Sequence, residues 1–194
     1  MSRGSLDSLL KQVRACRTCE SQLPLGPRPV LRASRSARIL IIGQAPGTKV
    51  HESGIPWNDA SGKRLRDWMQ IGFERFYDEK EIAIIPMGFC YPGKGKSGDL
   101  PPRPECAELW HEKLLNGLPN LQLRLLIGKY AQDYYLGTKR QSLTQTVQNW
   151  KDYLPDYFPL PHPSPRNIRW FKLNPWFESE VIPSLRDNIN LIYQ

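Results

Sequence analysis

The chain has 194 residues, with 27 Lys and Arg against 19 Asp and Glu, and a formal net charge of +8. This length fits one domain with one continuous core, so we treat residues 1–194 as a single domain. The positive charge favours a polyanionic partner such as nucleic acid over a small acidic metabolite. The sequence has neither an apolar run of membrane-spanning length nor a secretion signal, so we expect a cytoplasmic protein without a membrane partner. We also expect the chain to be a monomer.

The first 38 residues predict one helix and one long loop. Residues 5–15 carry three leucines and a valine at helical spacing, which predicts a helix ending beside Cys16. Residues 23–38 are rich in Pro and Arg. That composition excludes regular helix and predicts an extended surface loop whose charges face solvent or phosphate groups.

Four short apolar runs then follow, at residues 39–42, 82–85, 123–127 and 157–160. Each has the length of a strand, and segments of helical character lie between them. Because parallel strands need crossover connections, this alternation predicts an α/β fold of three layers, α/β/α, around a central four-stranded, mainly parallel sheet. Pro159 lies in the last run and places it at a sheet edge.

The helical segments show apolar residues on one face. Leu65, Trp68 and Met69 share a face in the first segment, and the second runs from Pro104 toward Leu114. The third, residues 130–150, predicts one or two short helices broken near Gly137. After the fourth strand, Asn174 and Pro175 predict the start of a last helix with a kink at Pro183.

Glycine, proline and polar residues follow every predicted strand, at residues 43–47, 86–90, 128–129 and 162–167. In open α/β sheets ligands bind beyond the carboxyl ends of the strands, so we expect these loops to form one crevice. The turn at residues 43–47 can present backbone N–H groups to a ligand, although many such turns bind nothing. His162 precedes Pro-Ser-Pro, which would fix its ring; a purely structural histidine is the alternative.

The four cysteines form a C-x-x-C pair, Cys16 and Cys19, and a second pair, Cys90 and Cys106, separated by a loop. In a reducing cytoplasm they are better suited to metal binding than to disulfides. Four thiolates fit either a tetrahedral zinc ion or an iron-sulfur cluster, and the spacing does not decide between them. Buried cysteines without a metal are the third possibility.

Together these motifs resemble the uracil-DNA glycosylase superfamily. Residues 43–47, G-Q-A-P-G, are similar to the G-E-A-P-G motif of the iron-sulfur uracil glycosylases of thermophiles. Residues 54–57, G-I-P-W, fall where that family has G-x-P-F. Residues 162–167, H-P-S-P-R-N, are similar to the second motif of the single-strand-selective uracil glycosylases. The cysteine arrangement also resembles that of the four-iron family.

The resemblance implies a monofunctional DNA glycosylase acting in base excision repair. Its partner would be DNA containing a damaged base, and it would hydrolyse the N-glycosidic bond of an extruded deaminated base, uracil or a related lesion. In this interpretation His162 donates a hydrogen bond to the departing base. Gln44 and Ala45 hold the base carbonyls and the attacking water, and Trp57 stacks on the base.

Further roles follow from the same resemblance. The expected substrate-binding residues are Gly43, Gly47, Trp57, Ser164, Arg166 and Asn167, with phosphate contacts extended by Lys94, Lys96, Arg169 and Lys172. The expected cofactor is a 4Fe-4S cluster on Cys16, Cys19, Cys90 and Cys106, with zinc as the fallback.

Three departures from the family pattern keep other functions open. Gln44 replaces a family glutamate whose carboxylate could orient water, and the nearby Glu52 and His51 are candidates to take over that role. Pro86 stands where the family has an asparagine that reads uracil. The R-x-x-H segment of the crosslinking members is absent. The chain could therefore prefer hypoxanthine or xanthine, accept several bases, or be a catalytically inactive nucleic-acid-binding module of the same fold. A small-molecule enzyme is a third possibility, which predicts binding insensitive to salt.

Overall fold

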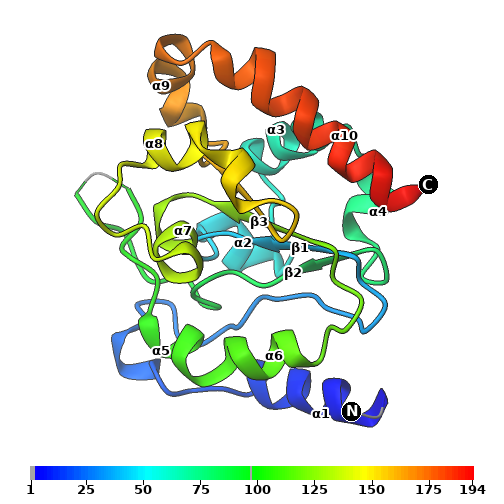
Figure 1. Cartoon of the computed structure of the whole chain (residues 1–194). Coiled ribbons are helices and arrows are strands. Elements are labelled where there is room, and N and C mark those ends of the chain that lie inside the picture. Colours follow the sequence, from blue (N-terminus) through cyan, green and yellow to red (C-terminus); the bar gives the residue numbers. More distant parts are fainter. Residues whose placement is uncertain (1–2, 97) are drawn as a thin grey trace.

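Four parallel strands form the middle layer of the chain in a computed structural model that describes residues 3–96 and 98–194 (Figure 1). The order across the sheet is β2-β1-β3-β4. Within it, Ile41 pairs with Ile84 on one side and with Leu125 on the other. The predicted α/β fold is confirmed, and the sheet is wholly parallel with β4 at an edge. The strands are β1 (Ile39–Ile42), β2 (Ile82–Ile84), β3 (Leu123–Ile127) and β4 (Tyr157–Leu160).

Both faces of the sheet are covered by helices, which explains why the strands are apolar runs rather than alternating sequences. Ile39 and Ile41 pack on one face, and Leu40 and Ile42 on the other. The first face is covered by α3 (Ala60–Met69), α4 (Phe73–Tyr77), α8 (Leu143–Gln148) and α10 (Ile182–Tyr193). The second is covered by α1 (Arg3–Arg14), α6 (Glu112–Asn116) and α7 (Lys129–Leu136).

Short helical turns complete the chain between these elements. They include α2 (Thr48–Ser53), α5 (Pro104–Cys106), α9 (Ile168–Leu173) and three 3-10 turns, Glu20–Gln22, Trp150–Tyr153 and Pro165–Asn167. The predicted break between α7 and α8 lies at Gly137, whose φ of 67° closes α7 in the left-handed region. Ser142 then opens α8 with a capping box.

The last helix differs from the prediction in how it begins. Asn174 is followed by a π-helical segment, Phe177–Val181, before α10. Pro183 therefore sits in the first turn of α10, directly after a widened turn. Because proline lacks an N–H group, it fits at the start of a regular helical stretch, and the kink expected at Pro183 stays a prediction. A second one, Ala107–His111, links α5 to α6.

The prediction of a surface loop at residues 23–38 is wrong for its middle part. Val30, Leu31 and Ala33 are buried. Arg32 pairs with Ile84 in an antiparallel bridge, in which the Arg32 N–H donates to the Ile84 carbonyl at 2.9 Å and the Ile84 N–H donates back at 2.7 Å. This segment covers the free edge of β2, where unpaired backbone groups would otherwise face solvent.

No helix in the described parts of the chain is both long and apolar enough to cross a lipid bilayer.

Candidate functional site

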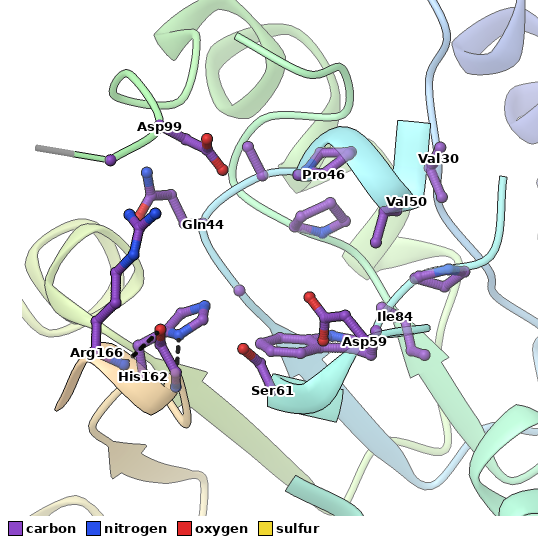
Figure 2. Close-up of a pocket in the computed structure, with 18 of the residues that line it drawn as sticks. Val30, Gln44, Pro46, Val50, Asp59, Ser61, Ile84, Asp99, His162 and Arg166 are labelled. Atoms are coloured by element: carbon purple, nitrogen blue, oxygen red, sulfur yellow. Dashed lines mark hydrogen bonds between the residues drawn. The ribbon is translucent and has the colours of Figure 1, made fainter. Parts of the chain in front are cut away.

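A cavity of about 570 Å³ opens at the carboxyl ends of the strands, where the loops after β1, β2 and β4 meet (Figure 2). Three of the four predicted loops thus converge as the parallel topology requires, but the prediction is wrong for residues 128–129 after β3, which do not line the cavity. The cavity is lined by all the residues with a predicted catalytic or base-binding role: Gly43, Gln44, Ala45, Gly47, Trp57, His162, Ser164, Arg166 and Asn167. The structure brings these side chains together, while their roles stay predictions.

Two glycines make room for Trp57 in the cavity wall. A Cβ atom at Gly43 would lie 2.7 Å from Cζ2 of the indole, and one at Gly62 would lie 1.7 Å from the Trp57 carbonyl oxygen. Trp57 itself has φ of 58°, in the left-handed region that bulky residues rarely adopt. The strained part of Trp57 is therefore its backbone, and the absence of a Cβ at Gly43 lets the indole pack against the turn after β1.

His162 presents a defined hydrogen-bond donor to the cavity. Its Nδ1 accepts the backbone N–H of Ser164 at 3.1 Å, so the single proton of the neutral ring lies on Nε2. Burial lowers the pKa of His162, and the opposing charge of Asp59 does not overcome it. The ring faces the cavity (Figure 2) and lies 5.5 Å from the Trp57 ring, centroid to centroid. A fixed, neutral N–H donor therefore stands beside an aromatic surface.

The loop that carries His162 is braced from within. Asn167 Nδ2 donates to the His162 carbonyl at 2.8 Å, and Ser164 Oγ accepts the Arg166 N–H at 3.2 Å. Arg64, from α3, donates to the carbonyls of Pro163 and Ser164. These bonds position the ring, and they leave the Arg166 guanidinium at the rim of the cavity (Figure 2).

The wall after β2 offers few free hydrogen-bonding groups. The N–H groups of Met87 and Gly88 donate to the carbonyls of Gly43 and Gln44 at 2.8 and 2.9 Å. Pro86 has no N–H, and its side chain cannot hydrogen bond. This wall therefore contributes shape rather than donors to the cavity.

The Pro86 carbonyl is itself bound by a buried histidine that the sequence did not single out. His111 Nε2 lies 3.1 Å from this carbonyl oxygen, and Nδ1 lies 2.6 Å from the Tyr135 hydroxyl. Because the carbonyl can only accept, Nε2 carries the proton and Nδ1 accepts from Tyr135. Burial lowers the pKa of His111 to about 4, so the ring is neutral. Its hydrogen bond to the Pro86 carbonyl stabilises this wall of the cavity.

The two residues considered from sequence as substitutes for the family glutamate do not line the cavity. His51 and Glu52 lie on α2 outside the lining, and the Gln44 amide Nε2 donates to the Leu100 carbonyl at 3.2 Å. Within the described residues, the carboxylates of the lining are Asp59 and Asp99. Asp59 was missed, although its position just before an amphipathic helix is a typical capping signal.

The four cysteine thiols lie close enough to influence one another. The pKa of Cys90 is raised to about 11 and that of Cys106 to about 12, mainly by burial and in smaller part by the charges of the other cysteines. For Cys16, hydrogen bonding to Thr18 outweighs burial and lowers the pKa. In residues 3–96 and 98–194, however, no group of three or more Cys, His, Asp or Glu side chains is arranged to hold a metal ion.

The donor set nevertheless suits a thiolate-bound group. All four candidate ligands are sulfur atoms, and the Phe89 N–H points to Cys106 Sγ at 3.4 Å, a contact that stabilises sulfur charge. Cys19 and Cys90 pack together with Leu23 in a small apolar cluster. The four cysteines thus offer a donor set that suits the expected cluster.

Comparison with known proteins identifies the family of the chain. The model of the uracil DNA glycosylase superfamily matches residues 32–186. A Type-4 uracil-DNA glycosylase from Archaeoglobus fulgidus is 24% identical over 133 residues, which are 67% of this chain and 63% of that protein. A Methanosarcina acetivorans protein assigned as a uracil DNA glycosylase, solved by solution NMR, is 18% identical with a TM-score of 0.45, over 82% of this chain and 98% of its own. The chain belongs to the uracil DNA glycosylase superfamily.

Proposed function

We propose that the chain is a monofunctional DNA glycosylase that removes a deaminated base from DNA by hydrolysis. The observation that carries this proposal is the His162 geometry: an Nε2–H donor fixed by the Ser164 N–H and facing a cavity beside Trp57. Bond cleavage places negative charge on the departing base, and a fixed donor stabilises that charge without reorganisation. A neutral ring suffices, because the hydrogen bond rather than proton transfer does the stabilising.

The remaining residues of the cavity would bind and orient the nucleotide. Trp57 stacks on the extruded base, a contact worth about 1–3 kcal/mol that tolerates different bases. Gln44 and Ala45 border the base and the water from the turn after β1. Arg166 at the rim of the cavity, together with the exposed side chains of Lys94, Arg169 and Lys172, would contact phosphates.

Base selectivity in this proposal does not come from the wall after β2. Pro86 provides no donor, its carbonyl is taken by His111, and the adjacent N–H groups are bonded within the chain. A deaminated purine such as hypoxanthine or xanthine is therefore as good a candidate as uracil. The relative from Archaeoglobus fulgidus favours uracil as the first base to test.

We propose that Cys16, Cys19, Cys90 and Cys106 bind a structural 4Fe-4S cluster, with zinc as the alternative. The supporting observations are the all-sulfur donor set and the Phe89 N–H directed at Cys106. Such a cluster would tie the segment after α1 to the loop after β2 and supplies no step of the hydrolysis. A brown protein with absorbance near 400 nm would support iron and sulfur, while colourless protein containing zinc would reject that assignment.

The test of the function is release of free base from labelled oligonucleotides containing uracil, hypoxanthine or xanthine, in single and double strands. We expect release from at least one substrate and a large loss in His162→Ala. If no lesion is processed while DNA still binds, the chain is instead a nucleic-acid-binding module. This alternative function is supported by Gln44 and Pro86, which depart from the family pattern.

A further inference from the structure

We propose that Asp59 is the carboxylate that binds the attacking water and accepts its proton. This role rests on the proposed glycosylase function and assigns a residue of this chain to the step that Gln44 cannot perform as a base. An amide side chain can orient water, but it has no acceptor basic enough to take a proton.

Asp59 is fixed in the cavity wall by the helix that follows it. It is the N-cap of α3, and its Oδ1 accepts the Gly62 N–H at 2.8 Å. The backbone is extended there, with φ of −152°. One carboxylate oxygen is thus used to hold the side chain, and the second is left for a ligand. Figure 2 shows the carboxylate directed into the cavity, on a different side from His162.

This separation matches what the reaction needs. The water must attack the anomeric carbon from the side away from the departing base, so its acceptor belongs across the cavity from the donor that stabilises the base. Asp59 is nevertheless near enough to His162 for its charge to act on that ring. A single short segment, residues 57–59, thereby provides both the aromatic surface and the carboxylate.

Other groups are less suited to this role. The Gln44 amide is occupied by the Leu100 carbonyl. Asp99 also lines the cavity, but it is exposed at the rim, whereas Asp59 is partly buried. Screening by water weakens the charge of an exposed carboxylate, so Asp59 has the stronger field where positive charge develops on the sugar.

The proposed step balances in atoms and electrons. A water oxygen forms a bond to the anomeric carbon while the bond from that carbon to the base nitrogen breaks. The electron pair of the broken bond leaves on the base, whose charge His162 stabilises through its Nε2–H. The water proton passes to Asp59 and then to solvent, and the free base takes up a proton from solvent.

A binding experiment isolates the charge of Asp59 without requiring a known lesion. Two duplexes are compared, one with a neutral tetrahydrofuran abasic site and one with a cationic pyrrolidine analogue that resembles the charged sugar of the transition state. We expect the wild-type chain to prefer the cationic site by about tenfold or more, and Asp59→Asn to lose this preference. Asn caps a helix as well as Asp does, and Asp59→Ser provides a second variant that keeps the cap.

Two controls decide the assignment. Asp67→Asn removes an exposed carboxylate from the same helix, away from the cavity, and should keep the preference. Asp99→Asn tests the other carboxylate of the lining. The proposal is overturned if the wild-type chain shows no preference, if Asp59→Asn retains it, or if Asp99→Asn abolishes it.

Base release separates failure of this proposal from failure of the proposed function. Asp59→Asn should reduce single-turnover release by about 100-fold or more while it still binds the abasic duplexes. If the wild-type chain releases base and Asp59→Asn does so equally well, the glycosylase function stands and the Asp59 role is wrong. If the wild-type chain releases no base from any lesion, the function fails and the role fails with it.

Discussion

The base cavity and the cysteine cluster differ in how much of their geometry the chain itself provides. In the cavity, the Ser164 N–H orients His162, and Gly43 admits the Trp57 ring. The four cysteines come near one another, yet within the described residues they do not form a set that could hold a metal ion. The cavity is thus held by hydrogen bonds and packing within the polypeptide, whereas the cluster proposed for the cysteines would itself complete their geometry.

The largest expected effect is the loss of base release when the hydrogen-bond donor of His162 is removed. His162→Ala should lower base release by about 10²- to 10³-fold, because one fixed donor to developing charge is worth that much. Single-turnover kinetics measure the loss, with His51→Ala as a control because His51 does not line the cavity. An equal loss in both variants would mean that the effect is not specific to His162.

The second prediction concerns His111, which binds the Pro86 carbonyl behind the cavity wall and is expected to be neutral. Its pKa is about 4 in the folded chain and near 6.5 when unfolded. Between these values the unfolded chain binds a proton that the folded chain does not. The free energy of unfolding should therefore fall as the pH drops from about 6.5 to about 4, by on the order of 3 kcal/mol.

Denaturant titrations at several pH values check this expectation. The depressed pKa of His162 acts in the same direction, so the His111→Gln and His162→Ala variants are measured alongside the wild type. His111→Gln should show a shallower dependence on pH than the wild type. Identical slopes would contradict the buried neutral ring.

The third prediction concerns the four cysteines and the cluster proposed for them. Cys90→Ser should abolish the absorbance near 400 nm and lower the free energy of unfolding by on the order of 2 kcal/mol, since a bound group stabilises the folded state. Base release by the remaining folded protein should change little, because no step of the hydrolysis uses the cluster. Loss of catalysis without loss of stability would show that the two regions are not independent.

The smallest effect concerns the room made for Trp57. In Gly43→Ala the new Cβ meets the indole at 2.7 Å, so the ring must shift and stacking is weakened. We expect about a tenfold loss of base release, at the lower end of the 1–3 kcal/mol that stacking contributes. Gly72→Ala is the matched control because a Cβ there meets no atom within 4 Å. Equal activity of the two variants would mean that the Trp57 position is not critical.

The sequence predicted the sheet and the location of the site because both depend on local patterns. Four apolar runs separated by helical segments define a parallel sheet, and parallel strands bring their following loops to one edge. The helix before Cys16 and the break at Gly137 were likewise predictable from spacing and from glycine.

What the sequence did not predict depends on contacts between distant segments. The pairing of Arg32 with Ile84 was not predicted because the surrounding proline and arginine residues indicate a surface loop. The two apolar residues Val30 and Leu31 were the only local indication that this segment is buried. The role of His111 requires Tyr135, which lies on another helix. Asp59 was visible as a helix cap, but its direction into the cavity depends on how α3 packs on the sheet.

The most direct test of the account is a crystal structure of the wild-type chain with a duplex carrying a non-hydrolysable 2′-fluoro nucleotide of a processed lesion. We expect the base outside the helical stack, over the Trp57 ring, with a base oxygen about 3 Å from His162 Nε2. A base that remains stacked in the duplex, or that binds away from His162, would contradict the account.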